Sequence, residues 1–97
     1  MATFIALIDF TEQGIRNINE TTNRSDSLVA TAEKMGIKIR DVFWTSGVHD
    51  GVLIFEAPDD ETASALMLYI GSLGNVRTQS LRAYSKPEMN KIIAQMP

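Results

Sequence analysis

The hydrophobic positions of the chain fall into four short runs that alternate as strands do. The first, Thr3–Phe10, is apolar at both alternating sets of positions, with Phe4 and Ala6 on one side and Ile5 and Leu7 on the other. Successive side chains of a strand point to opposite faces of its sheet. A strand that is apolar on both faces is typical of the centre of a sheet, so we expect Thr3–Phe10 to lie there.

Two further runs, Ile37–Thr45 and Val52–Ala57, flank the turn-rich segment Ser46–Gly51 and predict a β-hairpin. The first of them carries lysine and arginine between its apolar residues, which is typical of a sheet edge. Its alternation changes phase near Asp41, and one extra residue in a β-bulge would account for the change. The second run is apolar on both faces, so it is predicted to be another central strand.

The last run, Val76–Tyr84, is interrupted by polar side chains at Arg77, Gln79 and Arg82 and is predicted to form the second edge of the sheet. Between the first two strands, Thr11 is a suitable N-cap for a short, weak helix. A break is expected at Thr21–Asn23.

A second helix is then expected to be capped at Asn23 and to end at Gly36 as a left-handed cap. The clearest helical period follows Asp59, a predicted N-cap, at the positions Ala63, Leu66, Met67 and Ile70.

The chain ends with a predicted helix that starts in a capping box formed by Ser85 and Glu88. Its apolar residues recur at helical spacing. We expect this helix to bury that apolar stripe, which consists of Met89, Ile92, Ile93 and Met96. A methionine-rich stripe of this kind also resembles a soft binding surface.

The order of elements predicts an α+β protein made of a single domain, residues 1–97. Strand, helix, hairpin, helix and strand make the βαββαβ order of the ferredoxin-like fold, here with a split first helix and an added C-terminal helix. In that fold the strands lie in the order 4-1-3-2. Strands one and three are therefore central, and these are the two strands that are apolar on both faces.

Helices cover only one face of such a sheet, so Ile5 and Leu7 on the other face would form an exposed apolar patch. A second copy of the chain is the simplest cover for this patch. We therefore expect a homo-oligomer, a dimer or larger, whose sheets pack face to face through Ile5 and Leu7.

Composition narrows the classes of function. A content of 44% hydrophobic and 22% charged residues is ordinary for a folded protein, and a net charge of −3 with scattered basic residues argues against nucleic-acid binding. With no cysteine and one histidine, we expect no disulfide and no metal site, and nothing indicates a cofactor. The apolar run Phe4–Ile8 is too short for a membrane span or signal core, so we expect a cytoplasmic protein that does not enter membranes.

Candidate chemistry centres on the hairpin. His49 titrates near neutral pH, and the adjacent carboxylate of Asp50 could make it a general base, although both residues are also ordinary turn formers. Trp44 could line an apolar pocket or belong to the core. Arg77 follows the segment Gly71–Asn75, where it could bind an anion, although that segment is more typical of a plain helix end.

Four stretches resemble one known family in order and spacing. They are Asp9–Ile18, Phe43–Gly47, Glu56–Glu61 and Gly71–Thr78, and the resemblance to the GYD domain family covers nearly the whole chain. It implies a ferredoxin-like domain similar to dimeric α/β-barrel proteins, without an activity that can be transferred. The Gly-Tyr-Asp motif of the family is altered here, because His49 occupies the tyrosine position, and a role for a tyrosine hydroxyl does not carry over.

Three functions fit these observations. The favoured one is a non-catalytic oligomeric protein that binds a small molecule or has a regulatory role, because no catalytic constellation is visible. The second is a small dimeric α/β-barrel-type enzyme that acts on an apolar or aromatic molecule between sheet and helices, with His49 as general base and Arg77 or Trp44 orienting the substrate. The third is a purely structural assembly subunit. A pocket lined by His49 would favour the enzyme.

Overall fold

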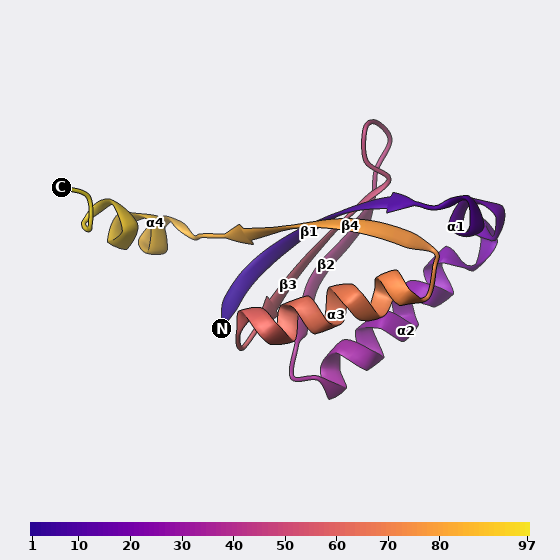
Figure 1. Cartoon of the computed structure of the whole chain (residues 1–97), viewed down its shortest axis with the longest axis horizontal. Coiled ribbons are helices and arrows are strands. Elements are labelled where there is room, and N and C mark those ends of the chain that lie inside the picture. The colour runs from indigo at the N-terminus through magenta and orange to yellow at the C-terminus, as the bar shows by residue number, and fades with distance from the viewer.

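The computed structural model describes residues 1–97 and shows a four-stranded antiparallel sheet with two long helices on one face (Figure 1). The elements are, in order, β1 (Ala2–Phe10), α1 (Glu12–Arg16), the 3-10 helix η1 (Ile18–Glu20), α2 (Thr21–Lys34), β2 (Lys38–Trp44), β3 (Gly51–Ala57), α3 (Asp60–Ser72), β4 (Val76–Ala83) and α4 (Lys86–Ile93). The strands lie in the order β2-β3-β1-β4. The ferredoxin-like order predicted from two-sided apolarity is therefore confirmed.

The core lies between the sheet and the helices α2 and α3. Phe4 from β1 and Phe55 from β3 stack with their ring centroids 5.4 Å apart, and Leu53 and Leu66 beside them are fully buried. Since α2 packs beside β2 and α3 beside β4, every strand has one covered face. We call this the covered face of the sheet.

The opposite side of the sheet has no helix of this chain packed against it, and we call it the open face (Figure 1). Half-buried aliphatic side chains fill its centre, and larger apolar side chains on the edge strands are about half exposed. Its apolar residues are Ile5 and Leu7 of β1, Val52 and Ile54 of β3, Phe43 of β2 and Leu81 of β4.

The predicted bulge in β2 is confirmed at Arg40. Ile39 lies opposite Phe55, whereas Asp41 lies opposite the preceding residue of β3, so Arg40 is the extra residue. An extra residue exchanges the faces to which the following side chains point. As a result Val42 faces the core and Phe43 lies on the open face.

The first helix is split, as predicted, but the break lies earlier than expected. The chain turns at Asn17, and α2 begins directly at Thr21, so the predicted break at Thr21–Asn23 and the cap at Asn23 are wrong. Asn23 lies in the first turn of α2. The turn is held by Arg24, which donates a hydrogen bond to the Asn17 carbonyl at 2.9 Å across seven residues. This contact stabilises the turn at Asn17.

The other helix caps agree with prediction. Thr11 accepts a hydrogen bond from the Gly14 N–H, and Asp59 accepts one from the Thr62 N–H at 2.7 Å. Gly36 has the expected positive φ of 77°. These features depend on neighbours in sequence, which explains why the sequence predicts them.

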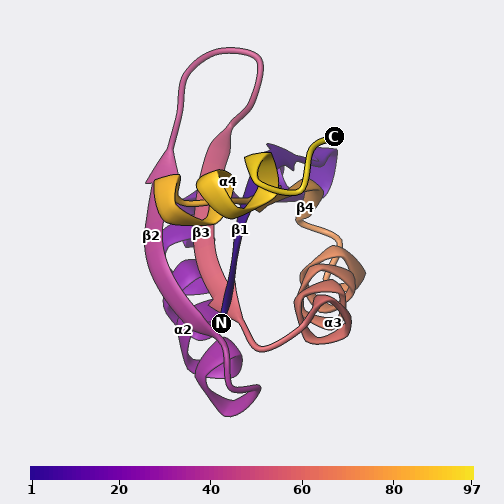
Figure 2. The same cartoon turned by 90° about the vertical axis from the view of Figure 1, so that its left-hand side faces the viewer.

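Helix α4 does not pack on the domain (Figure 1). The prediction that it buries its stripe is wrong, because Met89, Ile93 and Met96 are 46%, 50% and 68% exposed. Both views place α4 on the side away from α2 and α3 (Figures 1 and 2). The Cα radius of gyration is 14.6 Å, compared with about 12.5 Å for a compact domain of this length. The projecting helix and the projecting β2–β3 hairpin loop both contribute to this elongation (Figure 1).

Candidate functional site

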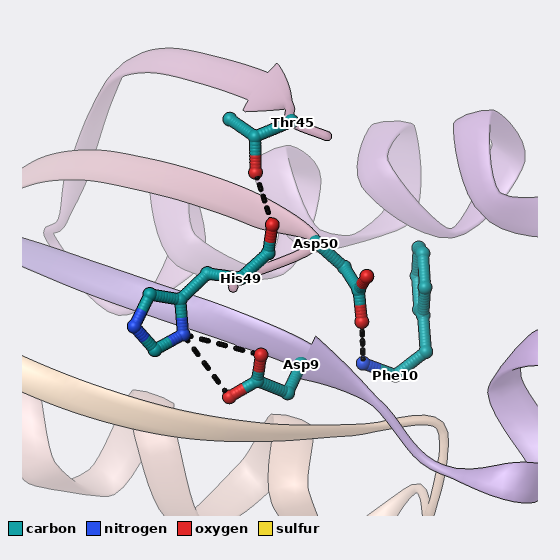
Figure 3. A network of polar contacts seen from close by, with 5 residues as sticks. All are labelled: Asp9, Phe10, Thr45, His49 and Asp50. Atoms are coloured by element: carbon teal, nitrogen blue, oxygen red, sulfur yellow. Dashed lines mark hydrogen bonds and ion pairs between the residues drawn. The ribbon is translucent and has the colours of Figure 1, made fainter. Parts of the chain in front are cut away.

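The base of the β2–β3 hairpin is tied to the end of β1 through Asp50. Its backbone N–H donates to the Ile8 carbonyl at 2.8 Å. Its carboxylate accepts a hydrogen bond from the Phe10 N–H at 2.8 Å (Figure 3). Thr45 closes the loop by donating its hydroxyl to the His49 carbonyl at 2.6 Å. The position of His49 is thus set by the hydrogen-bonded base of the hairpin.

The carboxylate that contacts His49 is Asp9, whereas we expected Asp50. The Nδ1 atom of His49 lies 3.2 and 3.3 Å from the two carboxylate oxygens of Asp9 (Figure 3). Asp9 follows Ile5 and Leu7 in the alternation of β1, so the pair lies at the end of the open face. The His49 side chain is 28% exposed and that of Asp9 is 36% exposed, and an ion pair at such exposure is weak.

A cavity of about 150 Å³ lies on the other side, between the covered face and the helices α2 and α3. Eleven of its 19 lining residues are hydrophobic. Trp44 lines this cavity, and its indole N–H donates to the Thr21 hydroxyl at 3.0 Å, which joins β2 to the start of α2. The cavity is also lined by Ile8, Leu28, Val42, Leu53, Tyr69, Ile70 and Val76.

The structure divides the predicted site residues between the two faces. Trp44 and Asp50 line the cavity, whereas His49 does not. Arg77 lies opposite Asp9 in the register of β4 and β1, on the open face, and is exposed. His49 and Arg77 both lie beside Asp9 at the end of the open face, whereas the cavity lies on the covered face and is lined by neither of them.

Asp9 is the residue that the sequence reasoning missed. It is the one acidic residue in the predicted strand Thr3–Phe10, at the end of a set of positions that is otherwise mostly apolar. That contrast was the available signal. Its partner lies 40 residues away, so the pairing itself depends on the way the hairpin packs against β1.

The two carboxyls with shifted pKa values, Asp59 and Glu88, take part in helix capping. The pKa of Asp59 is lowered by hydrogen bonds from the Thr62 side chain and backbone, and that of Glu88 by hydrogen bonds from the Ser85 backbone and side chain. Both carboxyls are helix caps. No group of three or more histidine, cysteine, aspartate or glutamate side chains is placed to hold a metal ion.

None of the helices combines the length and the apolar character that crossing a membrane requires.

Comparison with known proteins relates the chain to a family and to a curated protein. The model of the GYD domain family matches residues 4–93. The chain is also 30% identical over 84 residues to a protein of Thermus thermophilus named "Glutamine synthetase and cystathionine beta-lyase binding protein". That match covers 86% of this chain and 88% of the relative.

Proposed function

We propose that this chain, which belongs to the GYD domain family, is a non-catalytic binding protein. It works as a homo-oligomer and regulates a protein partner. The open face is the observation that carries this proposal. Ile5, Leu7, Val52 and Ile54 form its apolar centre, and Phe43 and Leu81 on its edges are 55% and 50% exposed. Apolar patches of this kind on a folded chain are characteristic of protein interaction sites.

The separation of the titratable pair from the cavity supports a non-catalytic role. A general base must lie within hydrogen-bonding reach of the substrate proton. The His49–Asp9 pair lies on the open face, whereas the cavity lies on the covered face. A substrate in the cavity would therefore meet no histidine.

Self-association is tested by sedimentation velocity over a range of protein concentrations. The wild type should sediment as a dimer or larger species at micromolar concentration. Leu7→Asp places an unpaired charge in an apolar interface and should give a monomer. The matched control is Ala65→Asp, which makes the same charge change at an exposed position of α3 and should leave the oligomer intact. A folded wild-type monomer that dilution does not change would overturn the proposal.

The name of the relative supports a protein partner, because that protein is described as binding two enzymes. We extend this role to the present chain. Surface plasmon resonance with purified glutamine synthetase and cystathionine beta-lyase from the same host should give saturable binding to at least one enzyme. Absence of binding to both enzymes at micromolar concentration would remove this part of the proposal and leave the self-association test unaffected.

A small-molecule ligand is the second candidate, and the cavity favours it. Its volume of about 150 Å³ is similar to that of an engineered apolar cavity that binds benzene, and it is below the ~300 Å³ of common drug-sized pockets. The volume and the mostly apolar lining therefore favour a small, largely apolar molecule the size of one ring.

The fluorescence of Trp44 provides the test, because it is the only tryptophan and it lines the cavity. Titration with toluene should change this fluorescence until it saturates. Leu28→Phe narrows the cavity and should abolish the change, whereas Val29→Phe alters the neighbouring position outside the lining and should preserve it. A response that does not saturate, or that survives Leu28→Phe, would exclude the cavity as a binding site.

A further inference from the structure

We propose that α4 is an exchange arm, which packs its apolar stripe against a second copy of this chain while the arm of that copy packs reciprocally on the first. The inference rests on the proposed homo-oligomer and deepens it, because it assigns a second contact to the same partner. The stripe consists of Met89, Ile92 and Ile93 of α4 and Met96 just after it. An apolar helix face without an intrachain contact is the starting observation.

The helix is well specified by its own sequence, yet too short to be stable alone. Ser85 accepts a hydrogen bond from the Glu88 N–H, and Glu88 accepts one from the Ser85 N–H at 2.9 Å. Isolated helices shorter than ~12–15 residues are marginal in water, and α4 has 8 residues. A helix of this length in a folded protein is normally held by packing of its apolar face, and the domain to which α4 belongs does not provide that packing.

Arg82, near the end of β4, contacts the segment that leads into α4. Its guanidinium donates to the carbonyls of Thr3 and Ala83 and lies 4.6 Å above the ring centre of Tyr84. It also lies 3.7 Å from the Glu88 carboxylate in the first turn of α4. Arg82 therefore links the end of β4 to the first turn of α4, and the stripe of the helix remains exposed.

The position of α4 indicates which partner covers its stripe. The arm lies on the same side of the molecule as the open face, opposite to α2 and α3 (Figures 1 and 2). Two sheets that pack face to face are separated by ~10 Å. A second sheet stacked on the open face would therefore lie beside the arm. A single partner with a flat apolar face would contact the open face and the stripe of α4 at once, and a second copy of this chain has such a face.

Two-fold symmetry completes the argument. In a symmetric pair, each contact made by one copy is repeated by the other. Each arm therefore packs on the partner chain, and the dimer contains two equivalent arm contacts. The receiving surface is the rim of the open face, where Phe43 on the edge strand β2 is 55% exposed. The stripe and this rim are both apolar, and each lacks an intrachain cover.

The test compares two aspartate substitutions in the full-length chain. Ile93→Asp places a charge in the stripe, whereas Ala94→Asp makes the same charge change one residue later, outside the stripe and at an exposed position. Losing the burial of one isoleucine at the interface raises the dimer dissociation constant about 10- to 100-fold. We expect this increase for Ile93→Asp and little change for Ala94→Asp, measured by sedimentation equilibrium.

Hydrogen exchange of residues 88–96 gives a second readout. These amides should be protected in the wild-type oligomer and should exchange much faster in the Leu7→Asp monomer, because the arm then has no partner. Equal dissociation constants for the two aspartate variants, or an unprotected α4 in an intact oligomer, would overturn the arm while the oligomer stands. Protection of α4 in a monomer would also overturn it, since the helix would then be covered by its own chain.

Discussion

The two faces of the sheet are built from the same two central strands, yet they have different fates. Phe4, Ala6, Leu53 and Phe55 face α2 and α3 and are between 0% and 7% exposed. Their immediate neighbours, such as Ile5 and Ile54, point to the other side and are only partly buried. Hydrophobicity along a strand therefore indicates which positions need a cover, but not which element supplies it.

The difference divides stability from association. On the covered face, apolar area is removed from water when one chain folds, and this burial is the main stabilising contribution. On the open face, apolar area is removed from water only when another chain binds. We therefore expect substitutions on the covered face to change folding and substitutions on the open face to change self-association.

The largest expected effect compares the same substitution on the two faces. Phe55→Ala removes a fully buried ring that stacks on Phe4 and should lower the free energy of unfolding by about 3–5 kcal/mol. Phe43→Ala removes an exposed ring from the open face and should weaken self-association more than folding. Urea denaturation at two protein concentrations separates the two quantities, because association adds a concentration-dependent stability. Similar losses of folding stability in both variants would contradict the distinction between the faces.

The second prediction concerns Asp50, which lies at the covered end of the hairpin base. Asp50→Ala leaves the Phe10 N–H without its acceptor and should lower the free energy of unfolding by about 1–3 kcal/mol. Asp50→Asn keeps an acceptor oxygen and should recover part of the loss. Thermal denaturation of both variants gives the comparison, and equal losses would show that the hydrogen bond is not the cause.

The third prediction concerns His49, the neighbour of Asp50 whose ring lies on the open side. His49→Ala and His49→Tyr should each change the free energy of unfolding by less than about 1 kcal/mol, as is usual for a partly exposed pair such as His49 and Asp9. Urea denaturation at low and high salt is the measurement. A loss larger than that of Asp50→Ala would place the dominant contact of the hairpin base on the open side.

The smallest expected effect is a pH dependence of helix stability, which arises from the caps of α3 and α4 at Asp59 and Glu88. Hydrogen bonds to the ionised carboxyls lower the pKa of Asp59 and Glu88 from ordinary values of 3.8 and 4.5. A lowered folded-state pKa means that each cap contributes stability above the ordinary value and loses it as the pH falls through the lowered one.

Helix α3 should survive this loss because Ala63, Leu66 and Ile70 anchor it in the core. In the monomeric Leu7→Asp variant, α4 has no such anchor and should lose helicity first. Carbon-13 chemical shifts of the two helices, followed from pH 6 to pH 2.5, give the order of loss. Simultaneous loss of both helices would contradict the difference in anchoring.

Local chemistry explains what the sequence predicted correctly at the hairpin and the caps. The bulge at Arg40 follows from the change of alternation around Asp41, and the capping box from serine and glutamate three residues apart. The partner of His49 could not be predicted in the same way. The sequence places a carboxylate beside the histidine in Asp50, and folding directs that carboxylate to the Phe10 N–H instead.

The sequence by itself determined the order of the strands, the two-sided apolarity of β1 and β3 and most of the helix caps, because these follow from side-chain alternation and from hydrogen bonds between near neighbours. The tertiary structure alone decided that His49 meets Asp9, that Trp44 lines a cavity without His49, and that α4 leaves the domain. Each of these depends on groups that are distant in sequence, such as Arg82, which contacts Thr3 across 79 residues. Such contacts form only when the chain is folded, and no local pattern encodes them.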